Sequence, residues 1–348
     1  MNDIRVLVVD DSAFMRKMIT DMIQTSKGMS VVDTARNGQQ ALDKIRSLKP
    51  DVVTLDVEMP VLDGLSVLRE IMNTEPIPVI MLSSLTQHGA DATIKSMELG
   101  AVDFVSKPSG SISLDIDNVK EELINKIHMA YQANLQKKPA HYQVKNTKQF
   151  LYHRNLIAIG VSTGGPKALQ ILLNQLPQEL ASPVIVIQHM PASFTKSLAR
   201  RLNQLSSLTV KEADHGEILK QGTVYIAPGG KQLTVKKVGQ TLVINIDLSP
   251  TGIKHTPSVD YTYHSLSKLS DFNLINVILT GMGSDGTNGL KQIKQSQPSH
   301  YIIAESEETS VIYGMPKSAI ENVGADAVLP INKIGEALTE LVVQKGES

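Results

Sequence analysis

The sequence predicts an α/β protein built from two domains, each around a mostly parallel sheet. Short β-branched runs alternate with amphipathic helical patterns along most of the chain, and parallel neighbours in a sheet require such crossover connections. A polar stretch near residue 140 interrupts the alternation, and no acidic residue occurs between Glu122 and Glu179. A chain of 348 residues is also long for a single core, which favours two domains of ordinary size.

The first part of the chain contains five candidate strands separated by helical patterns such as AFMRKMITDMI and QQALDKIRSL. We expect a doubly wound domain over residues 1–130, with helices covering both faces of a parallel sheet. The candidate strands are 4–9, 29–35, 51–56, 77–82 and 101–105.

A polar segment with a basic bias, QKKPAHYQVKNTKQFLYHRN, follows the first domain and has no apolar period. It predicts a solvated linker over residues 131–152. The alternation of strands and helices then resumes, so we expect a second α/β domain over residues 153–348. Its candidate strands lie within 155–161, 182–190, 222–230, 232–238, 241–247, 272–283 and 299–306.

Composition excludes several classes of protein. Thirty-four basic and thirty-five acidic side chains give a formal net charge of −1, and there is no Trp, so nothing predicts binding to nucleic acid. The absence of Cys excludes disulfides, thiolate metal sites and a Cys nucleophile. The N-terminal apolar run is too short for a signal peptide, and no run approaches the ~18 apolar residues of a membrane span. We therefore expect a cytoplasmic protein without direct membrane insertion.

Five polar residues follow the candidate strands of the first domain: Asp10, Asp11, Asp56, Ser83 and Lys107. Because the carboxyl ends of parallel strands share one edge, these side chains should converge. Three carboxylates at one place repel unless a cation lies among them, and oxygen ligands suit Mg²⁺. Alternatively, Asp11 and the following serine form a helix cap, which explains those residues singly but not the whole set.

A second set of polar residues follows strands of the second domain. Gly160, Ser162 and Gly164 spell G-x-S-x-G between a strand and a helix, which can expose a serine hydroxyl. His189 ends the apolar run PVIVIQ, and Asp285 follows the strand INVILT. A serine nucleophile needs a base, and the base needs an orienting acid, so the three residues predict a catalytic triad.

Each member of this set also has a simpler explanation. GVSTGGP can be a glycine turn whose proline starts a helix, and Asp285 can be an ordinary turn residue. A Walker-type phosphate loop is a poorer fit, because G-x-x-x-x-G-K-[ST] is absent. The chain order Ser, His, Asp also differs from the Ser, Asp, His order of α/β-hydrolases, so that fold is not expected.

The first domain resembles the receiver domain of two-component response regulators. The resemblance implies that Asp56 accepts a phosphoryl group, that Ser83 and Lys107 contact this group, and that Phe104 is the aromatic switch position. It also implies a Mg²⁺ site formed by Asp10, Asp11, Asp56 and the carbonyl of Glu58. The motifs that carry the resemblance are DD at 10–11, DVEMPVLDG at 56–64, MLSS at 81–84 and DFVSKP at 103–108.

The second domain resembles the catalytic domain of the chemotaxis protein-glutamate methylesterases, the CheB family, over roughly residues 152–345. That family's fold is a Rossmann-like α/β domain. The resemblance implies that Ser162 is the nucleophile, His189 the general base and Asp285 its orienter, with the Met282 N–H as an oxyanion donor. It rests on IGVSTGGP, QHMPASFTKSLARRL, VYIAPGG, PSVDYTYHSL, LTGMGSDGTNGL and VIYGMPKSAI.

The combined resemblance implies a phosphorylation-controlled hydrolase in chemotaxis adaptation. It would remove γ-methyl esters from glutamates of methyl-accepting chemoreceptors, releasing methanol, and deamidate receptor glutamines. A chemotaxis histidine kinase would supply the phosphoryl group, Mg²⁺ would serve the receiver, and the catalytic domain would need no cofactor. The rival hypothesis is a receiver-controlled binding module without enzymatic activity.

Three positions depart from the pattern expected of the family. Val161 stands where alanine is usual, Gln232 where histidine is common, and the run from Glu305 to Glu308 replaces an AQDE-like sequence. The second and third departures are expected to alter substrate contacts. None of them falls on the predicted triad.

Overall fold

A computed structural model describes residues 3–108, 116–133, 143–144, 154–248, 250 and 252–342. The chain divides into two compact units, Met1–Leu135 and Gln136–Ser348, and each is described by itself. The predicted linker lies outside the described residues except for 131–133 and 143–144. Within the described part of the chain, no helix combines the length and the apolar character needed to cross a bilayer.

The first unit is the predicted doubly wound domain, with a five-stranded sheet in the order β2-β1-β3-β4-β5. All four strand pairs are parallel. The strands are β1 (Ile4–Val9), β2 (Met29–Ala35), β3 (Val52–Asp56), β4 (Val79–Ser83) and β5 (Asp103–Ser106). The central strands β3 and β4 are buried at every position, as expected of a parallel sheet covered on both faces.

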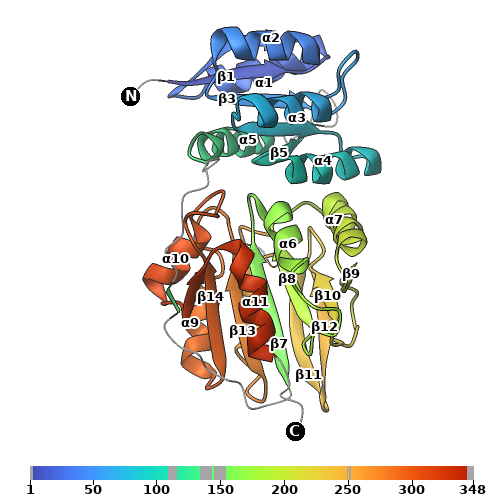
Figure 1. The fold of residues 1–348 in the computed structure, drawn as a ribbon, viewed down its shortest axis with the longest axis vertical. Coiled ribbons are helices and arrows are strands. Elements are labelled where there is room, and N and C mark those ends of the chain that lie inside the picture. The colour runs from blue at the N-terminus through green and yellow to red at the C-terminus, as the bar shows by residue number, and fades with distance from the viewer. Residues whose placement is uncertain are drawn as a thin grey trace. The chain divides into compact units, whose positions relative to one another are not determined.

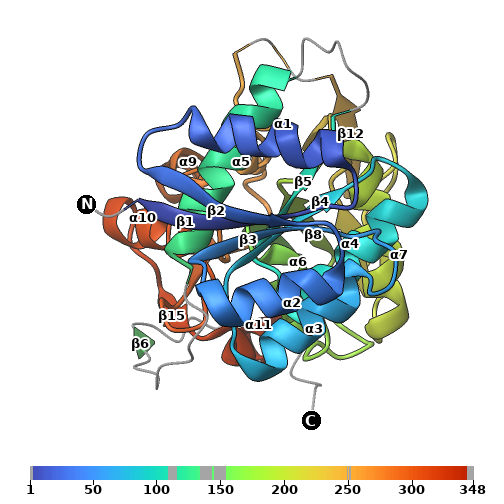
Figure 2. The same ribbon diagram turned by 90° about the horizontal axis from the view of Figure 1, so that it is seen from above.

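Five helices cover this sheet. Figure 2 shows α1 (Ala13–Gln24) and α5 (Ile116–Tyr131) on one face, and α2 (Gly38–Leu48), α3 (Gly64–Thr74) and α4 (Gln87–Leu99) on the other. The first four helices begin at polar caps whose side chains accept an N–H of the first turn. These caps fix where each loop at the carboxyl edge of the sheet ends.

The second unit is built on an eight-stranded sheet in the order β6-β15-β14-β13-β7-β8-β10-β9. Only the pair of β6 (Gln143–Val144) with β15 (Ala327–Leu329) is antiparallel. The other strands are β7 (Asn155–Val161), β8 (Val184–Gln188), β9 (Thr209–Glu212), β10 (Thr223–Ile226), β13 (Asn273–Ile278) and β14 (His300–Glu305). The predicted α/β class is therefore confirmed, whereas β6, β9 and β15 were not foreseen.

Two of the predicted strands do not join this sheet. β11 (Gln232–Val238) and β12 (Thr241–Asp247) pair with each other as an antiparallel hairpin. Helices α6 (Gly165–Leu173), α7 (Ala192–Leu205), α8 (Val259–Leu266), α9 (Thr287–Ser296), α10 (Met315–Asn322) and α11 (Ile331–Val342) complete the unit (Figure 1). The hairpin therefore lies between β10 and α8 in the chain.

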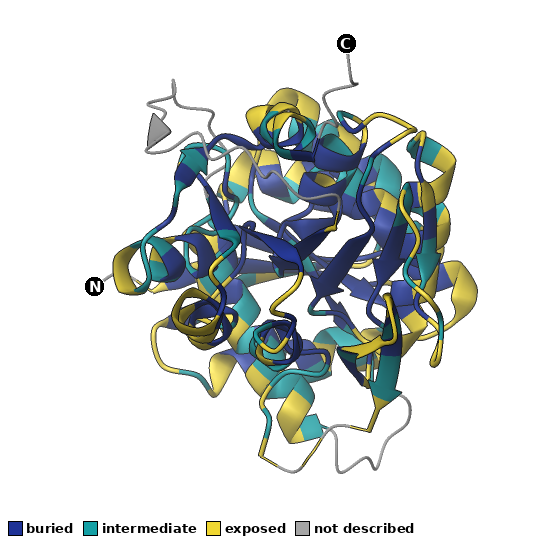
Figure 3. Ribbon diagram, turned by 90° about the horizontal axis from the view of Figure 1, so that it is seen from below, coloured by how far each residue is buried: buried dark blue, intermediate teal, exposed yellow. Residues whose placement is uncertain are grey.

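The core of the second unit lies along its central strands, which are buried at every position of β7, β8 and β13 (Figure 3). Tyr263 of α8 is fully buried, and its hydroxyl is 3.0 Å from the carbonyl oxygens of both Ala158 and Val277. This buried phenol therefore fixes α8 against the two strands that carry the predicted nucleophile and its acid.

Candidate active site

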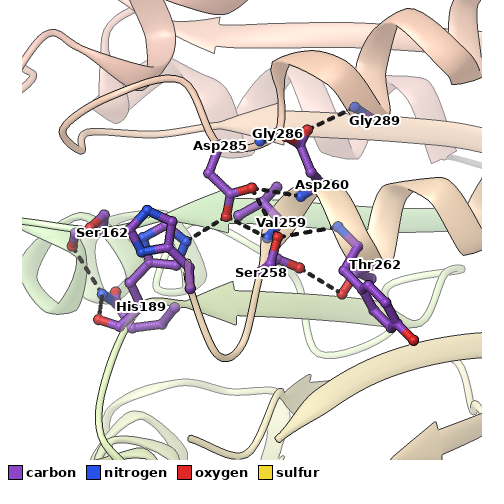
Figure 4. A network of polar contacts seen from close by, with 12 residues as sticks. Ser162, His189, Ser258, Val259, Asp260, Thr262, Asp285, Gly286 and Gly289 are labelled. Carbon is purple, nitrogen blue, oxygen red and sulfur yellow. Dashed lines mark hydrogen bonds and ion pairs between the residues drawn. The ribbon is translucent and has the colours of Figure 1, made fainter. Parts of the chain in front are cut away.

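Ser162, His189 and Asp285 meet at the carboxyl edge of the second sheet (Figure 4). They follow β7, β8 and β13, which are neighbours in the order β13-β7-β8. His189 Nδ1 lies 3.2 Å from Ser162 Oγ, and His189 Nε2 lies 2.7 Å from Asp285 Oδ2. The predicted triad residues are therefore within hydrogen-bond reach of one another, with the acid on the far side of the imidazole from the serine.

The turn that carries Ser162 is held by backbone contacts. Its N–H donates to the carbonyl of Thr280 at 3.0 Å, and its carbonyl accepts from the Gly165 N–H at 2.8 Å. Gly164 adopts a φ of 79° at the start of α6, a conformation that favours glycine. A Cβ on Gly281 would lie 2.7 Å from Ser162 Cβ, so the segment after β13 can approach the serine only because it has a glycine there.

Gln188 ties the serine turn to the histidine. Its side-chain Nε2 donates to the Ser162 carbonyl at 2.9 Å and to the His189 carbonyl at 3.1 Å. The His189 N–H also donates to the Val161 carbonyl at 3.1 Å. The separation between Ser162 and His189 is thus fixed by three hydrogen bonds that do not involve the imidazole ring.

Asp285 is held in its ionised form by a cluster of donors. Oδ2 accepts from the Val259 N–H at 2.7 Å, and Oδ1 accepts from the Ser258 hydroxyl and the Asp260 N–H, each at 3.0 Å. Burial raises the pKa of Asp285, but His189 and these N–H groups outweigh burial and lower it to about 2. The acid therefore stays negative and can orient and stabilise a His189 imidazolium.

Asp260 arranges the turn that delivers Asp285. Its Oδ1 accepts from the N–H groups of Gly286 and Gly289, at 2.9 and 2.7 Å. Burial raises its pKa. Asp260 thus acts on the turn, whereas Asp285 acts on the imidazole.

Sequence reasoning missed His255, whose ring stacks on that of His189. The ring centroids are 4.3 Å apart and the planes differ by 8°. Burial, followed by the nearby His189, lowers the pKa of His255 to about 4, so this ring is neutral near pH 7. A histidine in a polar loop remote from any predicted strand end gave no signal of this contact.

Gln232, the first residue of β11, is fully buried beneath this loop. Its Nε2 donates to the His255 carbonyl at 2.8 Å, and its Oε1 accepts from the Ser258 N–H at 2.8 Å. The departure noted in the sequence therefore holds the loop between His255 and Ser258, and its buried amide is committed to the backbone.

The predicted oxyanion donor lies just after Thr280. Met282 is half exposed, and its N–H has no hydrogen-bond acceptor among the described residues. The residue before it, Gly281, is tied by its N–H to the Ile312 carbonyl at 3.0 Å. Because Gly281 approaches Ser162 closely, the N–H of the neighbouring Met282 remains a candidate for stabilising developing negative charge.

The first unit brings together a second polar site. Carboxylate oxygens of Asp10, Asp11 and Asp56 all lie within 4.8 Å of one another. Lys107 Nζ contacts Asp10 Oδ2 at 2.8 Å and Asp56 Oδ2 at 2.7 Å. Burial, with a smaller contribution from the charge of Asp10, raises the pKa of Asp56 to about 6, although Lys107 acts to lower it. One lysine does not compensate three acids, and this set of oxygen ligands fits Mg²⁺.

The remaining predicted residues of this unit have local partners. The Ser83 hydroxyl donates to the Gly89 carbonyl at 3.1 Å and accepts from the Thr93 hydroxyl at 2.6 Å. Phe104 is 4% exposed, and its ring lies 5.0 Å from Lys126 Nζ. Ser83 is therefore engaged with the start of α4.

Two further residues border the acidic cluster. The Glu58 N–H donates to Asp56 Oδ1 at 3.3 Å, so the Glu58 backbone lies beside the cluster. Ser12 caps α1, accepting from the Met15 N–H at 3.4 Å. Helix capping and a convergent acidic cluster thus coexist at this edge.

Comparison with known proteins identifies both units. A family model described as CheB methylesterase matches residues 157–338, and one described as response regulator receiver domain matches residues 6–115. The chain belongs to the CheB methylesterase family. Its relatives include proteins from Geobacillus kaustophilus (49% identical, covering 98% of this chain and 99% of the relative) and Bacillus licheniformis (51%, 96% and 97%). Both are named protein-glutamate methylesterase/protein-glutamine glutaminase.

A solved CheB structure supports the same assignment. The methylesterase catalytic domain of Thermotoga maritima CheB is 46% identical, with a TM-score of 0.52, covering 54% of this chain and 99% of that domain. The predicted CheB resemblance and the receiver resemblance are thus confirmed.

Proposed function

We propose that this protein is a phosphorylation-controlled hydrolase that removes methyl esters from glutamate side chains of chemoreceptors and deamidates receptor glutamines. Its CheB relatives carry both activities in their names, and the receiver match supports control by phosphorylation. The observation that carries the proposal is the Ser162–His189–Asp285 constellation, because a buried, ionised acid beside an imidazole within 3.2 Å of a serine hydroxyl is an arrangement for acyl transfer.

The reaction follows from the geometry. Ser162 Oγ attacks the ester carbonyl while His189 Nδ1 takes its proton, and the Met282 N–H stabilises the oxyanion. The carbonyl–methoxy bond then breaks, and His189 returns the proton so that methanol leaves and a glutamyl ester of Ser162 remains. Water, activated by His189, hydrolyses this ester to release glutamate and regenerate Ser162. A glutamine substrate follows the same route with ammonia as the leaving group.

We also propose a division of the chain into a receiver at 1–130, a linker at 131–152 and a catalytic domain at 153–348. The family matches at 6–115 and 157–338 support it. The methyl-accepting receptor is the substrate, and the chemotaxis histidine kinase is the phosphodonor.

In the receiver we propose Asp56 as the phosphoacceptor, with Lys107 and Ser83 as contacts for the phosphoryl group. A Mg²⁺ ion held by Asp10, Asp11, Asp56 and the Glu58 carbonyl would neutralise charge between carboxylate and phosphate. Lys107 already contacts two of these carboxylates. Its ammonium would be shared with the phosphoryl oxygens after transfer.

The decisive experiment measures methanol released from methylated receptor membranes by the full chain, with and without acetyl phosphate and Mg²⁺. We expect release that increases with the phosphodonor, and loss on the order of a million-fold in Ser162→Ala. Ser270→Ala, a matched change at an exposed position, should retain full activity. Equal release by wild type and Ser162→Ala, or none by wild type, would contradict the proposal and favour a binding module.

A further inference from the structure

Glu305 is a buried carboxyl group that the triad does not use. It is the last residue of β14 and is 0% exposed. Glutamate is rarely buried without a compensating partner, because removing the charged form from water is costly. Its position at the carboxyl edge of the sheet, one strand from β13, places it near the segment that carries Thr280 and Met282.

The partners of Glu305 are neutral. Oε2 accepts from the Thr280 N–H at 2.8 Å, and Oε1 lies 2.9 Å from the Thr309 hydroxyl. Burial raises the pKa of Glu305 to about 7, against the smaller lowering effects of these two groups. β14 packs against β13, β15, α9, α10 and α11. Among the described residues of these elements, no charged or titratable group contributes to the pKa shift of Glu305.

Thr280 connects this carboxyl group to the nucleophile. Its carbonyl accepts from the Ser162 N–H at 3.0 Å, and its hydroxyl donates to the Thr163 carbonyl at 2.9 Å. The same hydroxyl accepts from the Ile312 N–H at 3.0 Å. Thr280, whose N–H donates to Glu305, therefore also holds the turn that carries Ser162. It directly precedes the Gly281–Met282 segment.

We propose that Glu305 is a positioning residue for ester hydrolysis, acting through Thr280 in its protonated form, and that its ionisation slows the reaction. The inference rests on the proposed function, because it assigns the Met282 N–H as the oxyanion donor. Protonation at Oε1 reverses the bond to Thr309, whose hydroxyl oxygen already accepts from the Ile331 N–H at 3.0 Å and can accept a second hydrogen. The neutral acid thus keeps both contacts without placing a charge in the core.

The charge of the ionised form would act mainly on the oxyanion. One residue, Gly281, lies between Thr280 and Met282, so with a hydrogen bond at each end the carboxylate and the developing oxyanion are about 10 Å apart. At an effective dielectric constant of about 20, two like charges at this distance slow a reaction about tenfold. His189 follows β8, three strands from β14, or about 14 Å away. At the same dielectric constant, attraction between the carboxylate and a His189 imidazolium offsets most of the repulsion, so a net slowing of about twofold remains.

The variant Glu305→Gln distinguishes the effect of the hydrogen bonds made by residue 305 from the effect of its charge. The glutamine carbonyl can accept from the Thr280 N–H, and its amide can donate to the Thr309 oxygen, so both contacts survive without a titrating group. Glu340→Gln is the matched control, because it makes the same chemical change at an exposed residue of α11, outside the predicted site.

The test measures kcat and KM for methanol release by the full chain from pH 6 to pH 9. We expect wild-type kcat to fall about twofold above pH 7, Glu340→Gln to follow wild type, and Glu305→Gln to retain activity without the alkaline decline. A parallel decline in Glu305→Gln and wild type, or loss of activity in Glu305→Gln at pH 6, would overturn the inference.

Failure of the proposed function would look different. If wild type releases no methanol at any pH, the substrate assignment is wrong. The rate at which a fluorophosphonate labels Ser162 is then measured in place of methanol release, again comparing wild type with Glu305→Gln across the same pH range. An alkaline decline in labelling that Glu305→Gln removes would support the inference. Absence of labelling, or a decline shared by both proteins, would overturn it.

Discussion

Asp56 and Asp285 occupy equivalent places in their two domains but have opposite electrostatic environments. Asp56 is the last residue of the fully buried β3, and Asp285 lies in the loop after the fully buried β13, each at the carboxyl edge of its sheet. The pKa of Asp56 is raised to about 6, by burial first and then by Asp10, whereas that of Asp285 is lowered to about 2 by His189 and backbone N–H groups. The carboxylate proposed to accept a phosphoryl group thus lacks sufficient stabilisation of its charge, whereas the one proposed to orient the imidazole is stabilised in its ionised form.

The largest expected effect tests the reactive carboxylate. Asp56→Asn should abolish phosphorylation by acetyl phosphate, because Asp56 is the proposed acceptor and an amide does not form the acyl phosphate. Chelation of Mg²⁺ should do the same to wild type. Incorporation of labelled phosphate measures both. Glu58→Gln should remain phosphorylated, since only its backbone carbonyl is proposed as a ligand, and persistent labelling of Asp56→Asn would move the acceptor elsewhere.

The next effect tests the compensated carboxylate. Asp285→Asn should reduce methanol release about ten-thousand-fold, by analogy with another triad, because an amide can hold the imidazole in the wrong tautomer. Ser258→Ala removes one donor to Asp285 and leaves the two N–H bonds, so we expect a loss of only about tenfold. Comparable losses in the two variants would mean that the donor cluster, and not the acid itself, is essential.

The same comparison predicts stability effects of opposite sign. Because folding raises the pKa of Asp56, the protonated carboxyl group is favoured in the folded state. Its contribution to the free energy of unfolding is present below about pH 4 and is lost as the pH rises through about 6. In Mg²⁺-free buffer, Asp56→Asn should therefore stabilise the first unit at pH 7, by about 3 kcal/mol. Lowering of the Asp285 pKa gives a contribution present above about pH 4 and lost as the pH falls through about 2. Asp285→Asn should destabilise the second unit at pH 7 by about 2 kcal/mol.

Hydrogen exchange of the full chain can measure these effects unit by unit, because each sheet gives its own protected peptides. Slower exchange in β1 and β3 of Asp56→Asn, with β7 and β13 unchanged, is the expected pattern. For Asp285→Asn the faster exchange should be confined to the second unit. Changes of the same sign in both variants would show that the two environments are not opposed.

The smallest effect concerns the ring that stacks on His189. His255→Ala should lower kcat up to about tenfold with little change in KM, because a stacked pair contributes about 0.5–1.5 kcal/mol to holding the ring. His255→Phe restores a stacking surface and should recover most of the lost rate. Failure of phenylalanine to restore kcat would indicate a polar role for His255 instead.

Residues at strand ends could be predicted from sequence, and the rest of the site could not. Asp56 ends an apolar run, Ser162 follows one directly, and Asp285 comes after one and a short turn. Each side chain is thereby assigned to the carboxyl edge of its sheet, whatever the loops do. The strand predictions failed where this signal is weak: β9 and β15 are short, with four and three residues. The hairpin β11–β12 carries the same β-branched pattern as the sheet strands, and sequence alone does not show which partner it pairs with.

The donors and supports of the site come from segments that show no local pattern. Ser258 and His255 reach Asp285 and His189 only because Gln232 holds their loop, and this depends on where the hairpin packs. Glu305 was noted as a departure, yet its burial and its contact with Thr280 follow from the order of the strands. Contacts across a sheet edge are set by tertiary packing, which the one-dimensional spacing of these residues does not encode.

The double hydrogen bond of Gln188 has a consequence for thermal motion. One amide group donates to the carbonyls of both Ser162 and His189, so a displacement of either turn pulls the other in the same direction. Fluctuations of the two turns are thereby correlated, and the distance between the serine oxygen and the imidazole nitrogen varies less than the position of either atom. Both turns can therefore shift together while the separation of Ser162 Oγ and His189 Nδ1 changes little.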